Sequence, residues 1–174
     1  MPSDAAPSGL DRVTTHAAEL GLAIEVVERA AAGSLEEAAA ILGISPADIV
    51  KSLVVKHKDG SYLFALVPGD RQISWPKLRA LVGVNKLSLP DADAALAATG
   101  YARGTITPLG ALGPGGAPAG SGEGWPVYAD ERIRARRVSM GAGEHGRSLF
   151  VDGDELLESL GAVVADLTEP LPER

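Results

Sequence analysis

The sequence of 174 residues contains no cysteine and no long apolar run. Without cysteine, the chain cannot form disulfides or thiolate metal sites, and it cannot supply a cysteine nucleophile. No run approaches the roughly 18 apolar residues of a membrane-spanning helix, and Met1 to Gly9 has no basic segment followed by an apolar stretch. We therefore expect a cytoplasmic protein that has no membrane contact.

Positive charge is also in short supply, because 16 Lys and Arg face 23 Asp and Glu, a net charge of −7. Phosphate binding depends on clustered cations that displace counterions, so the net charge argues against a broad nucleic-acid surface, and any RNA contact should be local. The candidate for a local RNA-binding patch consists of four arginines: Arg132, Arg134, Arg136 and Arg137. Folding could add Lys51, Lys56, Lys58 and Arg71 to it. The alternative is that these are ordinary solvated charges.

The length and a hydrophobic content of 45% fit one globular domain, over residues 10–170, that buries about 70% of its unfolded surface. Residues 1–9 read as a disordered tail. Residues 113–124 contain six glycines and two prolines. Such a segment buries too little apolar area to offset its ordering cost, so we interpret it as a flexible insertion.

Local signals predict an alternation of helices and strands. Ser34 and Glu37 have the spacing of a capping box, and Gly43 can end the helix that begins after Ser34. Asp59-Gly60 is typical of a tight hairpin. The predicted helices cover residues 11–20, 35–42, 75–82, 91–99 and 152–160. The predicted strands cover residues 22–28, 50–57, 61–67, 127–129, 137–140, 148–151 and 162–165.

Two separated segments suggest a substrate site. In the strand 50–57, the period of two places Lys51 on one face with Leu53 and Val55, and Ser52 on the other. Burying a lysine among aliphatic side chains is costly unless an anion or a solvent-filled pocket lies nearby. The second segment, Gly104 to Gly110, has glycines where backbone amides could face a ligand. Taken alone, it could equally be an ordinary turn.

The order of several motifs resembles the YbaK/ProX family of aminoacyl-tRNA deacylases, which includes the editing domain inserted in bacterial prolyl-tRNA synthetases. The resemblance runs from about Leu10 to Leu167. The motifs that carry it are Ala40-Ile41-Leu42-Gly43, Ile49 to Val54, Leu66-Val67-Pro68-Gly69-Asp70, Gly104 to Gly110, Gly143-Glu144-His145-Gly146 and Ala165-Asp166-Leu167. It implies an α/β fold with a mixed, curved sheet flanked by helices.

The resemblance also implies roles for individual residues. Lys51 matches the lysine required for deacylation, which would hold the phosphate of the terminal adenosine or the substrate carbonyl. Gly104 and Gly110 frame the loop that takes the aminoacyl ester. The residues expected to contact the substrate are Ser52, Thr105, Ile106, Thr107, Pro108 and His145.

The resemblance leaves the substrate open between two types of relative. His145 favours relatives that edit alanine, although a histidine there could simply occupy a surface turn. Pro108-Leu109-Gly110 is an ending seen in relatives that edit cysteine, and Thr105 and Thr107 stand where relatives often have Gly or Ser. The pocket shape, and with it the specificity, therefore remains open.

The predicted activity is hydrolysis, in trans, of the ester of a mischarged tRNA, with Cys- or Ala-tRNA for proline as candidates. The expected partners are the 3′ acceptor end of the tRNA and, as a further candidate, an aminoacyl-tRNA synthetase. No cofactor or metal is expected, and no Gly-x-Ser-x-Gly elbow indicates covalent serine catalysis. The alternative is a non-catalytic module of the same fold that binds a nucleotide or an aminoacyl group.

Overall fold

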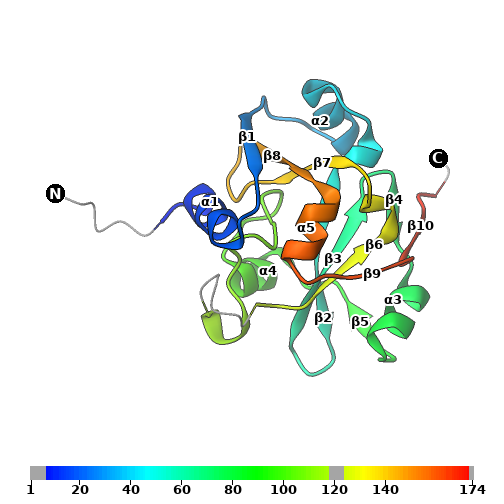
Figure 1. The fold of residues 1–174 in the computed structure, drawn as a ribbon. Helices are drawn as coiled ribbons and strands as arrows, with labels where there is room; N and C mark the ends of the chain where they lie inside the picture. Colours follow the sequence, from blue (N-terminus) through cyan, green and yellow to red (C-terminus); the bar gives the residue numbers. More distant parts are fainter. Residues whose placement is uncertain (1–6, 118–123, 173–174) are drawn as a thin grey trace.

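The computed structural model describes residues 7–117 and 124–172. Within them, five α-helices surround strands that form three sheets (Figure 1). The α/β class is confirmed. The strands divide into sheets of five, three and two strands, and the five-stranded sheet is the mixed one. In the described part of the chain, no helix is both long and apolar enough to cross a membrane.

The five-stranded sheet is mixed and forms the centre of the molecule. Its strands, in spatial order, are β5 (Leu87–Ser88), β2 (Val50–His57), β3 (Tyr62–Pro68), β6 (Val127–Asp130) and β9 (Val163–Ala165). The hairpin of β2 and β3 is antiparallel, whereas β6 and β9 add in parallel. The Asp-Gly signal at residues 59 and 60 therefore predicted this hairpin correctly, and Gly60 has the positive φ of 91° that the turn requires.

Two smaller sheets flank the central one. The first has the order β1 (Ile24–Glu28), β8 (Arg147–Asp152) and β7 (Arg137–Gly141), and it is antiparallel throughout. The second pairs β4 (Arg71–Ile73) with β10 (Thr168–Pro170). The sequence patterns missed β4, β5 and β10, because strands of two or three residues are too short to show a period of two.

The helices follow their capping signals closely. They are α1 (Gly9–Leu20), α2 (Leu35–Leu42), α3 (Trp75–Val82), α4 (Ala92–Thr99) and α5 (Gly153–Ser159). Single 3-10 turns cover Pro46–Asp48, Pro114–Gly116 and Glu131–Ile133. The Ser34 hydroxyl accepts from the Glu37 amide, and Gly43 ends α2 at a φ of 72°. These local hydrogen bonds satisfy amides and carbonyls that a helix end leaves unpaired.

Two boundaries differ from the sequence-based expectations. Helix α1 already begins at Gly9, with Ser8 as its N-cap, so the predicted tail of residues 1–9 extends too far. Residues 1–6 of that tail lie outside the described part of the chain. In the predicted insertion 113–124, residues 114–116 form a 3-10 turn and residues 118–123 lie outside the described part.

The two faces of β2 contact two different cores, as the period of two predicted. Val50 and Val54 belong to the larger core, which lies between the central sheet, α1 and the β1-β8-β7 sheet. Val55 belongs to the smaller core beneath α3, and Leu53 packs against it. Strand β2 therefore separates the two cores, and its neighbouring residues Lys51 and Ser52 face opposite ways.

Candidate functional site

A hollow of about 1000 Å³ lies along β2. Its walls come from the start of α2, the segment 89–95, the loop that begins at Arg103, the end of β7 and the start of β8. The polar and loop residues that line it include Arg29, Lys51, Ser52, Asp91, Arg103, Gly104, Ile106, Gly141 and Ser148. Hollows of 300–1,000 Å³ are typical of sites for small ligands.

The hollow exists because one edge of β2 is only partly paired. Strand β5 pairs with Lys56 and His57 at the far end of β2. The pairing with β7 is a single bridge from Ser139 to Ile49, the residue before β2. Residues 50–54 between these two contacts line the hollow. A sheet edge in this state presents backbone donors and acceptors that a ligand can use.

Lys51 is half-buried at the wall of the hollow. Its ammonium donates a hydrogen bond of 2.5 Å to the Arg71 carbonyl of β4. Desolvation lowers the pKa of Lys51, and the nearby carboxylates of Asp70 and Glu36 act in the opposite direction. An ammonium with three donors can keep this bond and still bind a ligand oxygen.

Ser52 lines the same hollow from the opposite face of β2. Its hydroxyl oxygen is buried and has no hydrogen-bond partner among the described residues. A buried hydroxyl without a partner costs free energy, and such groups occur where a ligand supplies the missing bond. The contact of Ser52 with the substrate remains a prediction, and this hydroxyl is the group that would make it.

The outer side of the loop 104–110 offers backbone donors. Gly104 and Ile106 line the hollow. Among the hydrogen bonds between described residues, neither of their amides has an acceptor. The loop lies close to β7, because a Cβ on Gly141 would come within 3.0 Å of the Ile106 carbonyl oxygen. Glycine at residue 141 therefore permits the approach that holds the loop against the hollow.

The inner side of the loop is part of the core. Thr105, Thr107, Pro108 and Gly110 are buried and do not line the hollow. The Thr105 hydroxyl donates to the Ala102 carbonyl, and the Thr107 hydroxyl accepts from the Leu109 amide. These four residues shape the loop from behind, and a direct contact with the substrate remains a prediction for each of them.

Helix α1 anchors the loop from the side away from the hollow. The Gly110 amide donates to His16 Nδ1 at 2.8 Å, so it is already used within the protein. Burial lowers the pKa of His16, against the raising effect of Glu19, and this favours the neutral imidazole that the bond requires. The Tyr101 hydroxyl donates to the Leu109 carbonyl, and its burial raises the pKa of Tyr101 to about 12.

His145 and Gly104 come together although they are 41 residues apart in the sequence. His145 is exposed in the turn between β7 and β8, and a Cβ on Gly104 would lie 3.8 Å from its Cε1 atom. His145 thus stands at the rim beside the loop and not among the residues that line the hollow. Within residues 7–117 and 124–172, no three His, Asp or Glu side chains are grouped to hold a metal ion.

Three of the four arginines in the arginine segment, residues 132–137, form ion pairs. Arg132 contacts Asp130 and Asp166, Arg136 lies 3.6 Å from Asp48, and Arg137 lies 2.6 Å from Glu25. Arg134 is exposed and has no ion pair with another described residue. None of the four lines the hollow, so their role in binding tRNA remains a prediction.

Two cations at the hollow were not predicted. Arg29 follows β1 and donates from Nε to the Ser148 hydroxyl at 2.8 Å, while Arg103 is exposed at the start of the loop. Together with Lys51 they outnumber Asp91, the single carboxylate among the lining residues. The position of Arg103, directly before Gly104, was the one sequence signal that could have identified it.

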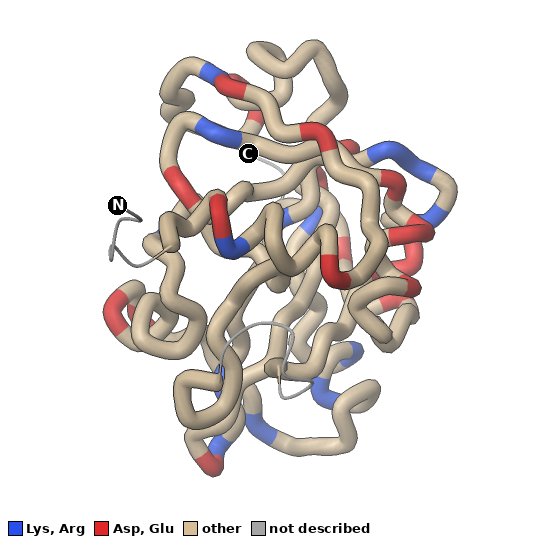
Figure 2. Tube along the Cα trace, turned by 60° about the vertical axis from the view of Figure 1, so that its left-hand side comes forward, with Lys and Arg blue, Asp and Glu red and all other residues tan. Residues whose placement is uncertain are grey.

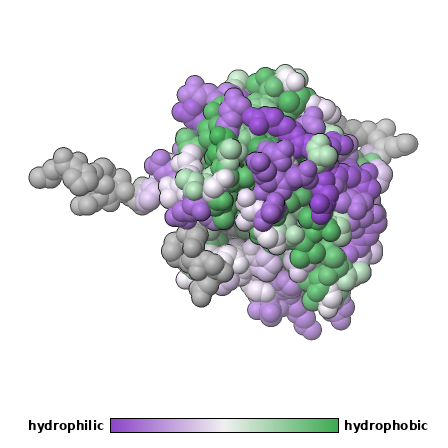
Figure 3. Space-filling model, in the orientation of Figure 1, coloured by the Kyte–Doolittle hydropathy of each residue, from purple (hydrophilic) through white to green (hydrophobic). Residues whose placement is uncertain are grey.

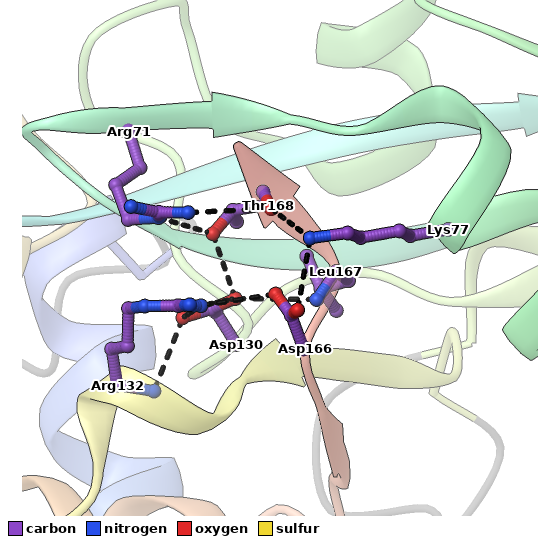
Figure 4. Close-up of polar contacts among 7 residues, drawn as sticks. All are labelled: Arg71, Lys77, Asp130, Arg132, Asp166, Leu167 and Thr168. Carbon is purple, nitrogen blue, oxygen red and sulfur yellow. Dashed lines mark hydrogen bonds and ion pairs between the residues drawn. The ribbon is translucent and has the colours of Figure 1, made fainter. Parts of the chain in front are cut away.

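A polar network at the ends of β6 and β9, on the other side of β3 from β2, was also missed. We call it the Asp130 clamp, and Figure 4 shows its members: Arg71, Lys77, Asp130, Arg132, Asp166, Leu167 and Thr168. Asp130 is fully buried and accepts hydrogen bonds from the Thr168 hydroxyl at 2.8 Å and from the Leu167 and Arg132 amides. The Arg71 Nε group also donates to the Thr168 hydroxyl. The clamp thereby fastens β10 to β4 and β6.

These features define a small α/β domain with an open hollow beside a lysine-bearing strand. The family model for the aminoacyl-tRNA editing domain matches residues 29–159, three quarters of the chain. The chain therefore belongs to the aminoacyl-tRNA editing domain family, which confirms the predicted resemblance.

The relatives fall into two groups. A proline–tRNA ligase of Thermosipho africanus is 40% identical over 84 residues, which are 48% of this chain and 14% of the ligase. The ligase of Shouchella clausii is 34% identical over 116 residues, 66% of this chain and 18% of that protein. The chain thus spans less than a fifth of the length of either ligase.

One of the solved structures, in contrast, has a similar length. A crystal structure of a candidate trans-editing enzyme for prolyl-tRNA synthetase superimposes with a TM-score of 0.80 at 29% identity. The match covers 95% of this chain and 99% of that one.

Proposed function

We propose that this chain is an aminoacyl-tRNA deacylase that acts in trans and hydrolyses the ester of a mischarged tRNA. Membership of the editing domain family and the likeness to the candidate trans-editing enzyme support the proposal. The observation that carries it is the set of donors that the hollow offers to a ligand, three of them without a partner among the described residues and one, Lys51, with further N–H groups beside its bond to Arg71. They are the amides of Gly104 and Ile106, the Ser52 hydroxyl and the ammonium of Lys51.

Each donor has a part in the reaction. The amides of Gly104 and Ile106 take the ester carbonyl oxygen, where negative charge develops when water adds to the carbonyl carbon. The bond from that carbon to the ribose oxygen then breaks, and the ribose oxygen takes up the proton that the water loses. Lys51 holds a phosphate or the carbonyl, and Ser52 orients the aminoacyl group or the attacking water.

The hollow contains few groups that could act as an acid or a base, because Asp91 is its only carboxylate among the described residues. An aminoacyl ester has an adjacent ribose hydroxyl, so orientation of a water against a stabilised carbonyl can supply much of the acceleration. The same shortage is the observation that favours the alternative, a module that binds an aminoacyl group without turnover.

The test is the release of free amino acid from a panel of mischarged tRNAs, beginning with Cys-tRNA and Ala-tRNA for proline. We expect multiple turnovers with at least one member of the panel, and correctly charged Pro-tRNA serves as the reference substrate. Addition of prolyl-tRNA synthetase to parallel reactions tests whether a synthetase is a partner. Tight binding of an aminoacyl-tRNA without release of amino acid from any member would establish the binding module instead.

A further inference from the structure

The turn between β2 and β3 and the segments beside it form a basic end of the molecule. We call it the hairpin end and define it by four cations: Lys56, Lys58, Arg79 and Lys86. We propose that the hairpin end is the docking surface for the phosphates of the tRNA acceptor arm, next to the hollow that takes the 3′ end. This inference rests on the proposed function.

The pairing of short strands brings these cations together. Lys56 pairs with Ser88 and His57 with Leu87, so the chain before β5, which carries Lys86, lies beside the hairpin. A second hollow of about 680 Å³ is lined by Lys58, Arg79 and Lys86 together with His57. Figure 2 shows this end at the bottom of the molecule, where Lys and Arg gather, and the bottom of Figure 3 shows a hydrophilic surface there.

The cations of the hairpin end form no ion pair with another described residue, in contrast to most of the arginine segment. The ion pairs between described residues use Lys77, Arg132, Arg136, Arg137 and Arg147, and none uses a cation of the hairpin end.

One carboxylate, Asp59, lies near these cations, so four positive charges face one negative charge. Asp59 accepts hydrogen bonds from the amide and the hydroxyl of Ser61, at 2.9 and 2.6 Å. Lys56, Lys58 and Lys86 are exposed and Arg79 is half-buried. In a protein of net charge −7, such a group of cations outside ion pairs is where phosphates can displace counterions.

The hairpin end is continuous with the first hollow. Ser52, Val54 and Lys56 alternate on one face of β2, so Lys56 lies about 13 Å along the strand from Ser52, at about 3.3 Å per residue. On the neighbouring segment, β5 leads directly into residues 89–91 of the first hollow. At an axial rise of about 3.4 Å per base pair, this span corresponds to about four base pairs of a duplex.

The experiment compares two doublets that remove the same charge. The variant K58Q/K86Q changes the hairpin end, and R134Q/R137Q changes two exposed residues of the arginine segment. Binding of uncharged tRNA is measured over a salt series, and kcat/KM is measured on a mischarged tRNA and on a short 3′-aminoacyl trinucleotide. Thermal melts of both variants check that they are folded.

We expect K58Q/K86Q to lower the logarithmic salt slope by about two, one for each phosphate contact, and to weaken tRNA binding about tenfold near 0.1 M salt. The ratio of kcat/KM on tRNA to kcat/KM on the trinucleotide should fall by a similar factor. R134Q/R137Q should change the tRNA affinity and the kcat/KM ratio less than twofold. If its effects on them equal or exceed those of K58Q/K86Q, the arginine segment is the docking surface instead.

The outcomes separate this inference from the proposed function. If K58Q/K86Q hydrolyses tRNA with an unchanged ratio and slope, the docking surface is wrong while the deacylase stands. Suppose instead that the wild-type protein hydrolyses neither substrate, while the K58Q/K86Q variant loses the salt-dependent binding of tRNA. The docking surface then stands and the proposed reaction is wrong.

Discussion

The hollow along β2 and the Asp130 clamp lie at different parts of the central sheet. They differ in whether their polar groups have hydrogen-bond partners within the protein. In the clamp, both carboxylate oxygens of Asp130 accept hydrogen bonds from neighbouring residues. In the hollow, the Ser52 hydroxyl and the amides of Gly104 and Ile106 have no partner among the described residues. Fully satisfied buried groups such as Asp130 stabilise a fold, whereas a buried group without a partner, such as the Ser52 hydroxyl, indicates a place for a ligand. Gly104 is exposed and Ile106 half-buried, so their amides are open to the hollow.

The two regions meet at Arg71. Its side chain donates to the Thr168 hydroxyl within the clamp, while its backbone carbonyl accepts from the Lys51 ammonium at the hollow (Figure 4 shows the clamp side). A change in the clamp should therefore affect stability first, and a change in the hollow should affect activity first. Four substitutions test this division.

The largest effect on stability is expected from Asp130→Ala. The substitution leaves the Thr168 hydroxyl, the Leu167 amide and Arg132 without their common acceptor. Breaking a buried ion pair costs about 3–5 kcal/mol, and we expect about 3 because the Arg132 side chain is 35% exposed. Chemical denaturation measures the loss. Asp130→Asn, which keeps the shape and one acceptor oxygen, should lose less, and a loss below about 1 kcal/mol for D130A would contradict the role of the clamp.

The largest effect on activity is expected from Lys51→Ala. Loss of a donor to a developing or bound anion is worth about 2.7–4 kcal/mol in comparable sites, or about 100- to 1,000-fold in rate. The free energy of unfolding should change little, because Lys51 is only half-buried and makes one hydrogen bond. Deacylation assays and thermal melts measure the two quantities. Near-normal turnover by folded K51A would remove Lys51 from the mechanism.

The sequence predicted the parts of both regions that depend on local signals. The hairpin, the alternation of Lys51 and Ser52 and the ends of α2 follow from a turn, a period of two and two caps, each readable within a few residues. The contacts between distant residues could not be read in this way. His16 with Gly110, Arg29 with Ser148 and Asp130 with Thr168 join residues 94, 119 and 38 positions apart.

The arginine segment shows that closeness along the chain does not predict which charges stay free of ion pairs. Its charges are close together in the sequence, but Arg132, Arg136 and Arg137 each meet a carboxylate from another part of the fold. The cations of the hairpin end are spread over 31 residues and meet in space through β2 and β5. Clustering along the chain is therefore a poor guide to the charge that remains available at a surface.

A smaller and more diagnostic effect is expected from Ser52→Ala. Because the Ser52 hydroxyl has no partner among the described residues, its removal should leave stability unchanged or raise it by up to about 1 kcal/mol. A lost hydrogen bond to the substrate should lower kcat/KM up to about tenfold. Ser148→Ala is the matched control in the same hollow, because the Ser148 hydroxyl accepts from Arg29 at 2.8 Å and its loss should lower stability by about 1 kcal/mol. Equal destabilisation by the two substitutions would show that Ser52 has a structural role.

The smallest effect concerns the exposed part of the clamp and depends on pH. Hydrogen bonds from Lys77 and Arg132 lower the pKa of Asp166 from 3.8 to about 2. Since the folded pKa lies below the unfolded one, the contribution of Asp166 to stability is present above about pH 4 and is lost as the pH falls toward 2. The side chain is 40% exposed and screened by solvent, so the contribution is small. We expect Asp166→Asn to lower the stability slightly at pH 6 and by less at pH 2, where Asp166 is about half protonated in the folded protein, as measured by urea unfolding at each pH. A difference between wild type and D166N that stays constant from pH 6 to pH 2 would show that the charge of Asp166 does not contribute.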